Sequence, residues 1–228
     1  MSEPVARLED VSKIYHLGAV DVHALRHVSI DVQQGEYVSI MGPSGCGKST
    51  LLNVVGCLDQ PTRGAYYLGG TNVAVCDDDT LSEIRGRRLG FIFQSYNLIP
   101  QLTVLENIEV PLQYQGVYEE EARARAIALA QRVGLGDRLH HRPLELSGGQ
   151  QQRVGIARSL ANDPLVLIAD EPTGNLDSQS GADILDLFDE LHAQGKTLVL
   201  VTHDDEISRR SQRIIRLLDG AVESDVRN

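Results

Sequence analysis

The segment 42–50, GPSGCGKST, contains residues whose types and spacing could bind a nucleoside triphosphate. Its glycines would let backbone amides converge on phosphate oxygens without obstruction by a Cβ atom. Lys48 could reach the β- and γ-phosphates, and the Ser49 hydroxyl could bind Mg²⁺. A glycine-rich turn with a surface lysine is the alternative interpretation. The residues that we expect to contact the nucleotide here are Gly42, Pro43, Ser44, Gly45, Cys46, Gly47, Lys48, Ser49 and Thr50.

Two elements must position this loop. The run 36–41 is apolar and β-branched, which predicts a strand that enters the loop. The run 50–55 then predicts the first turns of a helix. The N-terminus of that helix would add about half a positive charge directed at the bound anion.

Asp170 and Glu171 follow the continuous apolar run 165–169, which predicts a strand buried on both faces. The carboxyl ends of such strands form the edge at which α/β sheets bind ligands. Asp170 could therefore hold Mg²⁺, directly or through water, and Glu171 could activate water as a general base. A solvated turn before Pro172 is the alternative.

The pentapeptide LSGGQ at 146–150 suggests a second anion site. Ser147 is a favourable N-cap residue for the helix predicted over 150–161, and Gly148 and Gly149 would expose their amides. Alone, this pattern would indicate an ordinary helix start. Behind a phosphate loop it indicates a second nucleotide-contacting surface, which a single subunit would not need.

With these motifs in this order, essentially the whole chain resembles the nucleotide-binding subunits of ABC transporters. The resemblance implies an α/β fold: a P-loop NTPase core with an antiparallel β subdomain and an inserted α-helical subdomain. It also implies that two subunits face head to tail and enclose two ATP molecules with Mg²⁺. In that arrangement one subunit's signature loop contacts the nucleotide on the opposite subunit, through Ser147, Gly148, Gly149 and Gln150.

Four further residues take roles from the same resemblance. Gln94, in FIFQ, would contact Mg²⁺ and respond to a membrane partner, and Asp177 would lie at the dimer interface. His203, after the apolar run 198–201, would lie near the γ-phosphate and assist hydrolysis. Tyr15 would stack on adenine. For Tyr15 a simple packing role is the alternative, because other tyrosines occur in the same β-rich region.

The chain is expected to form one domain over 1–228, with a core at about 1–94 and 163–228 and a helical insertion at about 95–162. We expect short strands with glycine turns over 4–41 and continued β-rich character over 63–93. Helices are expected over 118–133, which is rich in helix formers, and around the apolar stripe 184–191.

Composition limits the other classes of function. A formal net charge of −11 argues against nucleic acid as the main partner. No apolar stretch reaches 18 residues, and the first residues do not resemble a signal peptide. Cys46, Cys57 and Cys76 have no metal-binding spacing and suggest a reducing compartment. We therefore expect a cytoplasmic protein, peripheral on the inner face of the cell membrane.

The segments 91–108 and 169–178 resemble the branch of the family that contains lipoprotein-release and macrolide-export ATPases. This resemblance implies an ATPase that energises an integral membrane permease for export or lipoprotein extraction, with the segment 96–107 facing that partner. A regulatory ATPase that drives cell-wall remodelling without transport is the alternative. A DNA-repair or translation ATPase would need long coiled coils or tandem ATPase units, which this chain lacks.

Overall fold

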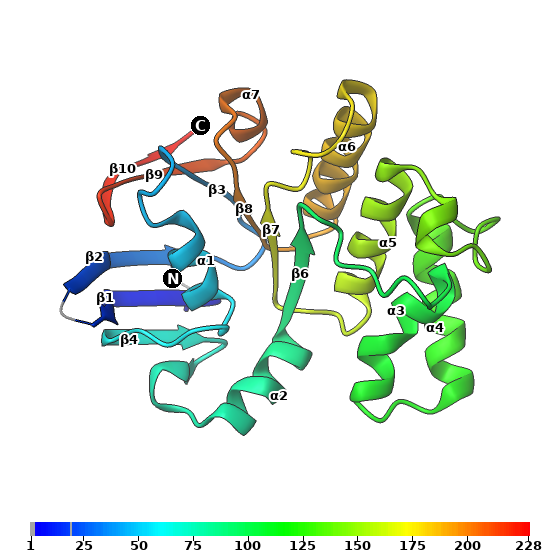
Figure 1. Cartoon of the computed structure of the whole chain (residues 1–228), viewed down its shortest axis with the longest axis horizontal. Coiled ribbons are helices and arrows are strands. Elements are labelled where there is room, and N and C mark those ends of the chain that lie inside the picture. Colours follow the sequence, from blue (N-terminus) through cyan, green and yellow to red (C-terminus); the bar gives the residue numbers. More distant parts are fainter. Residues whose placement is uncertain (1–2, 19) are drawn as a thin grey trace.

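The computed structural model describes residues 3–18 and 20–228; residues 1, 2 and 19, which the expected domain includes, lie outside the described part. The described chain forms two β-sheets and a group of helices (Figure 1). The strands are β1 (Ala6–Leu17), β2 (Val20–Val32), β3 (Tyr37–Met41), β4 (Arg63–Leu68), β5 (Thr71–Asn72), β6 (Leu89–Phe93), β7 (Val166–Asp170), β8 (Leu198–Val201), β9 (Arg213–Leu218) and β10 (Ala221–Arg227). The α-helices are α1 (Lys48–Val55), α2 (Asp78–Arg88), α3 (Val104–Tyr114), α4 (Glu119–Arg132), α5 (Gly148–Leu160), α6 (Ser178–Ala193) and α7 (Asp205–Ser208).

The larger sheet has the strand order β10-β9-β3-β8-β7-β6. All neighbouring pairs are parallel except β10 with β9. Its strands β3, β7 and β8 read as largely apolar runs because both of their faces are covered. In β7, Val166 and Ile168 join one buried cluster, whereas Leu167 and Ala169 join the other.

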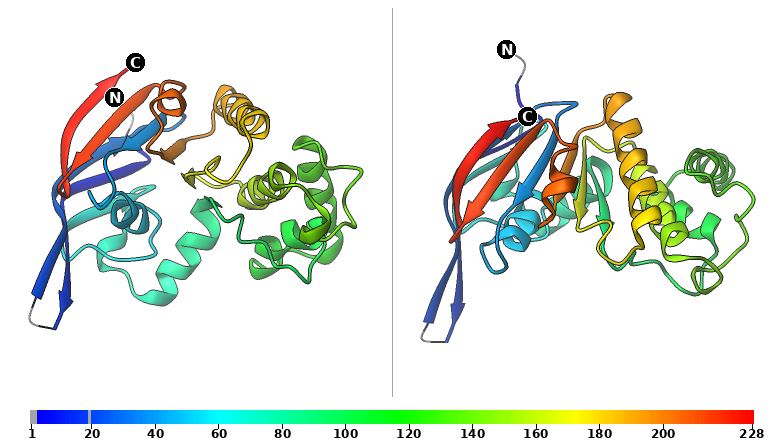
Figure 2. Two further views of the ribbon diagram at one scale, coloured as in Figure 1. Left: turned by 45° about the horizontal axis from the view of Figure 1, so that its top comes forward. Right: turned by 90° about the horizontal axis from the view of Figure 1, so that it is seen from above.

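The smaller sheet is antiparallel, with the order β2-β1-β4-β5. Helix α1 lies between the two sheets, and its Leu51 and Val54 are fully buried in the cluster that both sheets share. The β1–β2 hairpin extends away from the rest of the molecule (Figure 2). The helix that follows the phosphate loop is therefore held between the two sheets.

Helices α3, α4, α5 and α6 lie on the other side of the larger sheet (Figure 1). They share one apolar cluster with that sheet, in which Ile108, Ile156 and Phe188 are buried with Leu200. Over residues 3–18 and 20–228, no helix is long and apolar enough to cross a membrane.

Two local expectations are wrong. The segment 63–93 is not β-rich throughout, because α2 occupies its second half. Asp77 caps this helix, Asp78 and Asp79 lie in its first turn and arginines in its last, a charge arrangement that favours a helix. The segment 4–41 contains two long strands of 12 and 13 residues rather than short ones.

Other expected elements are present with small shifts at their ends. Helix α1 begins at Lys48 rather than at residue 50, and α5 begins at Gly148 rather than at residue 150. The helices expected over 118–133 and around 184–191 are confirmed as α4 and α6. Both early helix starts place glycine-rich motif residues in a first helical turn, where amides lack partners within the helix.

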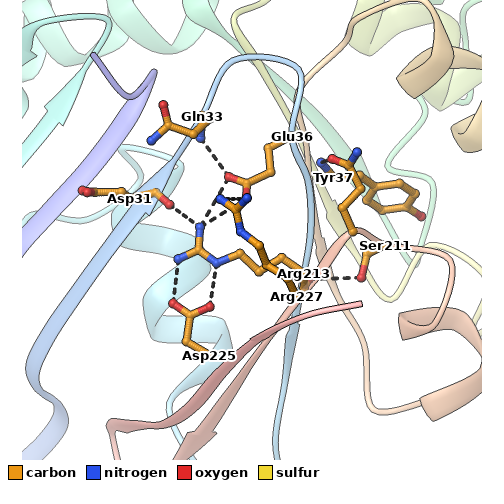
Figure 3. Close-up of polar contacts among 9 residues, drawn as sticks. Asp31, Gln33, Glu36, Tyr37, Ser211, Arg213, Asp225 and Arg227 are labelled. Atoms are coloured by element: carbon orange, nitrogen blue, oxygen red, sulfur yellow. Dashed lines mark hydrogen bonds and ion pairs between the residues drawn. The ribbon is translucent and has the colours of Figure 1, made fainter. Parts of the chain in front are cut away.

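A partly buried ion-pair cluster joins the C-terminal hairpin β9–β10 to the start of β3 (Figure 3). Arg213 forms two hydrogen bonds of 2.6 Å with the carboxylate of Asp225. It also donates to the Asp31 carbonyl at 2.7 Å and lies 3.3 Å from Glu36. Because β3 leads directly into the phosphate loop, this cluster anchors the hairpin beside the strand that positions the loop.

Candidate nucleotide site

The phosphate loop lines a cavity of about 1050 Å³ at the carboxyl ends of β3 and β7. Lys48 folds over the loop, and its Nζ donates to the carbonyls of Gly42 at 2.7 Å and Pro43 at 2.9 Å. Helix α1 has Gly47 at its N-cap and no side-chain cap. Amides of its first turn are therefore open to an anion, as the loop's proposed role requires.

Two glycines allow close approaches that no side chain would permit. Gly47 has a φ of +106°, and a Cβ atom there would lie 2.6 Å from the carbonyl oxygen of Ala24. Gly42 has a φ of +150°, and a Cβ atom there would lie 2.3 Å from the Leu217 carbonyl oxygen. The backbones of strand β2 and of the C-terminal hairpin therefore pack directly against the phosphate loop.

Asp170, Glu171 and His203 line the same cavity. Burial, and then the charge of Glu171, raise the pKa of Asp170, while Lys48 opposes the shift. The Nδ1 atom of His203 lies 2.7 Å from Glu171 Oε2 and 2.8 Å from Oε1. Glu171 adopts a positive φ of 43°, and its amide donates to the Val201 carbonyl at 2.9 Å.

The cavity has few protein groups that could bind a metal, which suits an ion held jointly by the protein and by the phosphates of a bound nucleotide. Ser49 and Asp170 both line the cavity, but the described residues contain no cluster of three or more acidic, histidine or cysteine groups that could hold an ion alone. Mg²⁺ usually binds through one or two protein oxygens together with substrate phosphates and waters. When bound, it would neutralise charge on the phosphates.

The signature loop is a tightly packed helix start. Ser147 and Gln150 form a capping box, in which each side chain bonds the other's backbone amide. A Cβ atom on Gly148 would lie 2.8 Å from the Tyr96 hydroxyl and 3.2 Å from Leu176. None of the residues 147–150 lines the cavity formed by the described chain.

Gln94 and Asp177 lie with this second surface rather than in the cavity. The side-chain Nε2 of Gln94 donates to Asn175 Oδ1 at 3.3 Å, and the side-chain Nδ2 of Asn175 donates to the backbone carbonyl of Gln94 at 3.1 Å. Asp177 caps α6 by accepting a bond from the Ser180 amide at 3.0 Å. The structure therefore brings Gln94 and residues 175–177 together with the signature loop.

Tyr15 lies beside the cavity and not among its lining residues. It pairs across the hairpin with Val22, which does line the cavity. Its hydroxyl donates to Asp59 at 2.8 Å.

One wall of the cavity consists of residues that none of the sequence motifs includes. Val22, His23 and Arg26 of β2 line it, together with Asp219 and Gly220 of the β9–β10 turn. No local pattern marks these residues. Only the tertiary structure shows that they lie beside the phosphate loop. The Arg26 amide donates to the Gly220 carbonyl at 2.7 Å, and the Gly220 amide donates to the Cys46 carbonyl at 2.9 Å.

The parallel sheet, the glycine-rich loop before α1 and the carboxylate pair after β7 define a P-loop nucleotide-binding ATPase. The profile of the ABC transporter family matches residues 25–174, and the chain belongs to that family. The fold expected from the resemblance is thereby confirmed.

Known relatives agree with this assignment. An uncharacterised ABC transporter ATP-binding protein of Thermotoga maritima is 58% identical over 219 residues, covering 96% of this chain and 94% of that protein. The macrolide export ATP-binding/permease protein MacB of Hyphomonas neptunium is 49% identical over all of this chain, which spans 35% of that protein. The dimeric, post-hydrolysis structure of the ATP-binding cassette MJ0796 with ADP and Pi has a TM-score of 0.88 at 47% identity, covering 97% of this chain and 98% of its own.

Replacing Gly47 with alanine should be far more damaging than replacing Gly45. Both have a positive φ, which costs a non-glycine residue on the order of 1–3 kcal/mol. A Cβ atom at Gly45 would meet nothing within 4 Å, whereas one at Gly47 would meet backbone at 2.6 Å. Urea unfolding without nucleotide should show a clearly larger loss of stability for Gly47→Ala. Equal losses would mean that β2 does not confine the loop.

Proposed function

We propose that this chain hydrolyses ATP to energise an integral membrane permease for export, and that two copies form the working ATPase. Within each site, the phosphate loop binds the triphosphate through its amides and Lys48. Ser49 and Asp170 would hold the metal. Gln94, which lies outside the cavity of the single chain, would reach that metal only if it moved toward the site. Glu171 accepts a proton from the attacking water, and His203 orients Glu171 or the γ-phosphate.

One observation supports the two-copy arrangement above all. Residues 147–150 form a helix N-terminus, a feature that suits an anion, yet they lie outside the cavity that the same chain forms. A second copy, turned head to tail, could supply this loop to the phosphates. The dimeric cassette structures at 47% identity are consistent with such a partner.

The His203–Glu171 contact supports the division of catalytic roles. A hydrogen bond to an imidazole holds the Glu171 carboxylate in one orientation, close to Asp170. A positioned carboxylate can accept a proton from water in the transition state.

A second cavity, a groove of about 760 Å³, is the proposed docking site for the membrane partner. Phe91 and Phe93 of β6, whose rings stack at 5.8 Å, contribute to its wall, and Tyr114 stands at its edge, 90% exposed. Its lining is mostly apolar with arginines from α2 and α5, which suits a short amphipathic helix carrying an acidic residue. Of the expected partner-facing segment 96–107, Asn97 alone lines the groove.

The groove is linked to the signature loop through Arg158. Arg158 lines the groove, and its guanidinium donates to the carbonyls of Asn97 at 2.7 Å and Tyr96 at 3.0 Å. Tyr96 and Asn97 both have positive φ angles, and the Tyr96 hydroxyl reaches Gly148 and the Asn175 carbonyl. A partner that displaces Arg158 would therefore move the surface that completes the opposite site.

Lys48→Ala and Glu171→Gln should fail in different ways. Loss of Lys48 removes a charge contact to phosphate, so nucleotide affinity should fall. Glu171→Gln keeps the shape of the site but removes the base, so turnover should fall about 10²–10⁴-fold with affinity retained. Nucleotide binding and phosphate release would be measured for both. Near-normal turnover of Glu171→Gln would refute its role as base.

Tyr114→Ala should weaken capture of the membrane partner about tenfold or more, because exposed aromatic residues often dominate interfaces. Tyr118→Ala is the matched control, since Tyr118 is 84% exposed but does not line the groove. Tagged variants would be used to co-purify partners from solubilised membranes of the source organism. The expected protein has membrane-spanning segments and is retained by Tyr118→Ala. Equal capture by both variants would place the partner elsewhere.

A further inference from the structure

Tyr15 is held in place by one side chain from outside its strand and by one from within it. Its hydroxyl donates to Asp59 Oδ2 at 2.8 Å, across 44 residues of sequence. The Lys13 ammonium lies over the Tyr15 ring, 5.0 Å from the ring centroid. A cation over one face leaves the opposite face for a planar base, because aromatic rings bind ligands mainly through their faces.

Asp59 is itself fixed by several donors. Lys13 Nζ bonds to its Oδ1 atom, which also accepts from the Gln60 amide at 2.8 Å. Burial alone would raise the pKa of Asp59, but the hydrogen bonds from Lys13, Tyr15 and Gln60 together hold it below its ordinary value. Asp59 is therefore a charged acceptor at neutral pH, and charge-assisted hydrogen bonds are the stronger kind.

Asp59 is also tied to the helix that begins in the phosphate loop. After α1 ends, Cys57 turns the chain with a φ of +53°, and the amides of Leu58 and Asp59 donate to the Asn53 carbonyl at 2.8 and 3.1 Å. A helix of the length of α1 spans about 12 Å. Its first turn thus faces the phosphates, while the segment after its last turn holds Tyr15.

The backbone around Asp59 has other anchors on β1. The Thr62 amide donates to the Ser12 carbonyl at 2.8 Å, and the Ile14 amide donates to Thr62 Oγ1 at 3.0 Å. These bonds do not involve the Asp59 carboxylate. Removing its charge should therefore release the Tyr15 hydroxyl without detaching the segment.

We propose that Asp59, supported by Lys13, is a positioning residue that holds the Tyr15 ring ready to stack on adenine, at a distance from the phosphates set by α1. The inference rests on the proposed nucleotide site and on the contact between Tyr15 and adenine that the resemblance to the family implies. It adds a residue that touches no part of the nucleotide and acts through Tyr15.

The test compares Mg-ATP with Mg-tripolyphosphate, which has the phosphates but no base. Binding of both would be measured for Asp59→Asn, Tyr15→Phe, Tyr15→Ala and the double variant Asp59→Asn/Tyr15→Phe. Asp21→Asn is the matched control, because Asp21 forms an exposed ion pair with His16 in the same hairpin.

Tyr15→Ala should weaken ATP binding about 10- to 100-fold, the range seen for loss of one aromatic–base stack. Asp59→Asn and Tyr15→Phe should each weaken it about 3- to 10-fold, and the double variant no further, since both remove one interaction. Tripolyphosphate binding should change less than about twofold in every variant. Asp21→Asn should match the unaltered protein for both ligands.

Two results would overturn the proposal while leaving the stacking role of Tyr15 intact. One is a loss with Tyr15→Ala but none with Asp59→Asn or Tyr15→Phe. The other is an equal loss of ATP and tripolyphosphate binding in Asp59→Asn, which would make Asp59 purely structural. If Tyr15→Ala itself leaves ATP binding unchanged, the adenine contact fails, and the proposal fails with it.

Discussion

The nucleotide site depends on how closely three backbone segments approach one another around the phosphate loop. Gly47 lies against the Ala24 carbonyl of β2, and Gly42 against the Leu217 carbonyl of β9. The amide of Gly220 then donates to Cys46 within the loop. A loop that must aim several amides at one anion gains from such confinement, because preorganised donors need no rearrangement when charge develops. The ion-pair cluster around Arg213 anchors the β9–β10 hairpin, which provides part of this confinement (Figure 3).

The phosphate loop is confined within its own chain, whereas the signature loop lies away from the cavity of that chain. The signature loop lies on the helical side of the larger sheet, in contact with Tyr96 and Leu176, outside the cavity of its own chain. In our account, binding and completion of the site are separate events: ATP first meets a rigid loop, and closure of two copies then adds the second set of donors. The groove beside Arg158 is where a membrane partner could sense or promote that closure.

The parts of this picture with strong local patterns were predictable from the sequence. The phosphate loop, the carboxylates after a buried strand and the strand itself follow from spacing and apolar runs. Helix α2 is not predicted from apolar periodicity, because only Leu81 and Ile84 are buried along it and it lacks an apolar stripe. Its capping residue and its charge pattern are the features of the sequence that indicate a helix. The β2 wall of the cavity and the Asp59–Tyr15 contact were not predictable, because both depend on long-range packing.

The central claim is that ATP joins two copies of this chain through the signature loop. Light scattering of Glu171→Gln with and without Mg-ATP tests it most directly, because this variant should bind nucleotide without consuming it. We expect a shift from monomer to dimer on addition of Mg-ATP, and we expect the further change Ser147→Arg to abolish that shift while nucleotide binding remains. A Glu171→Gln protein that stays monomeric at high concentration and saturating Mg-ATP would contradict the account.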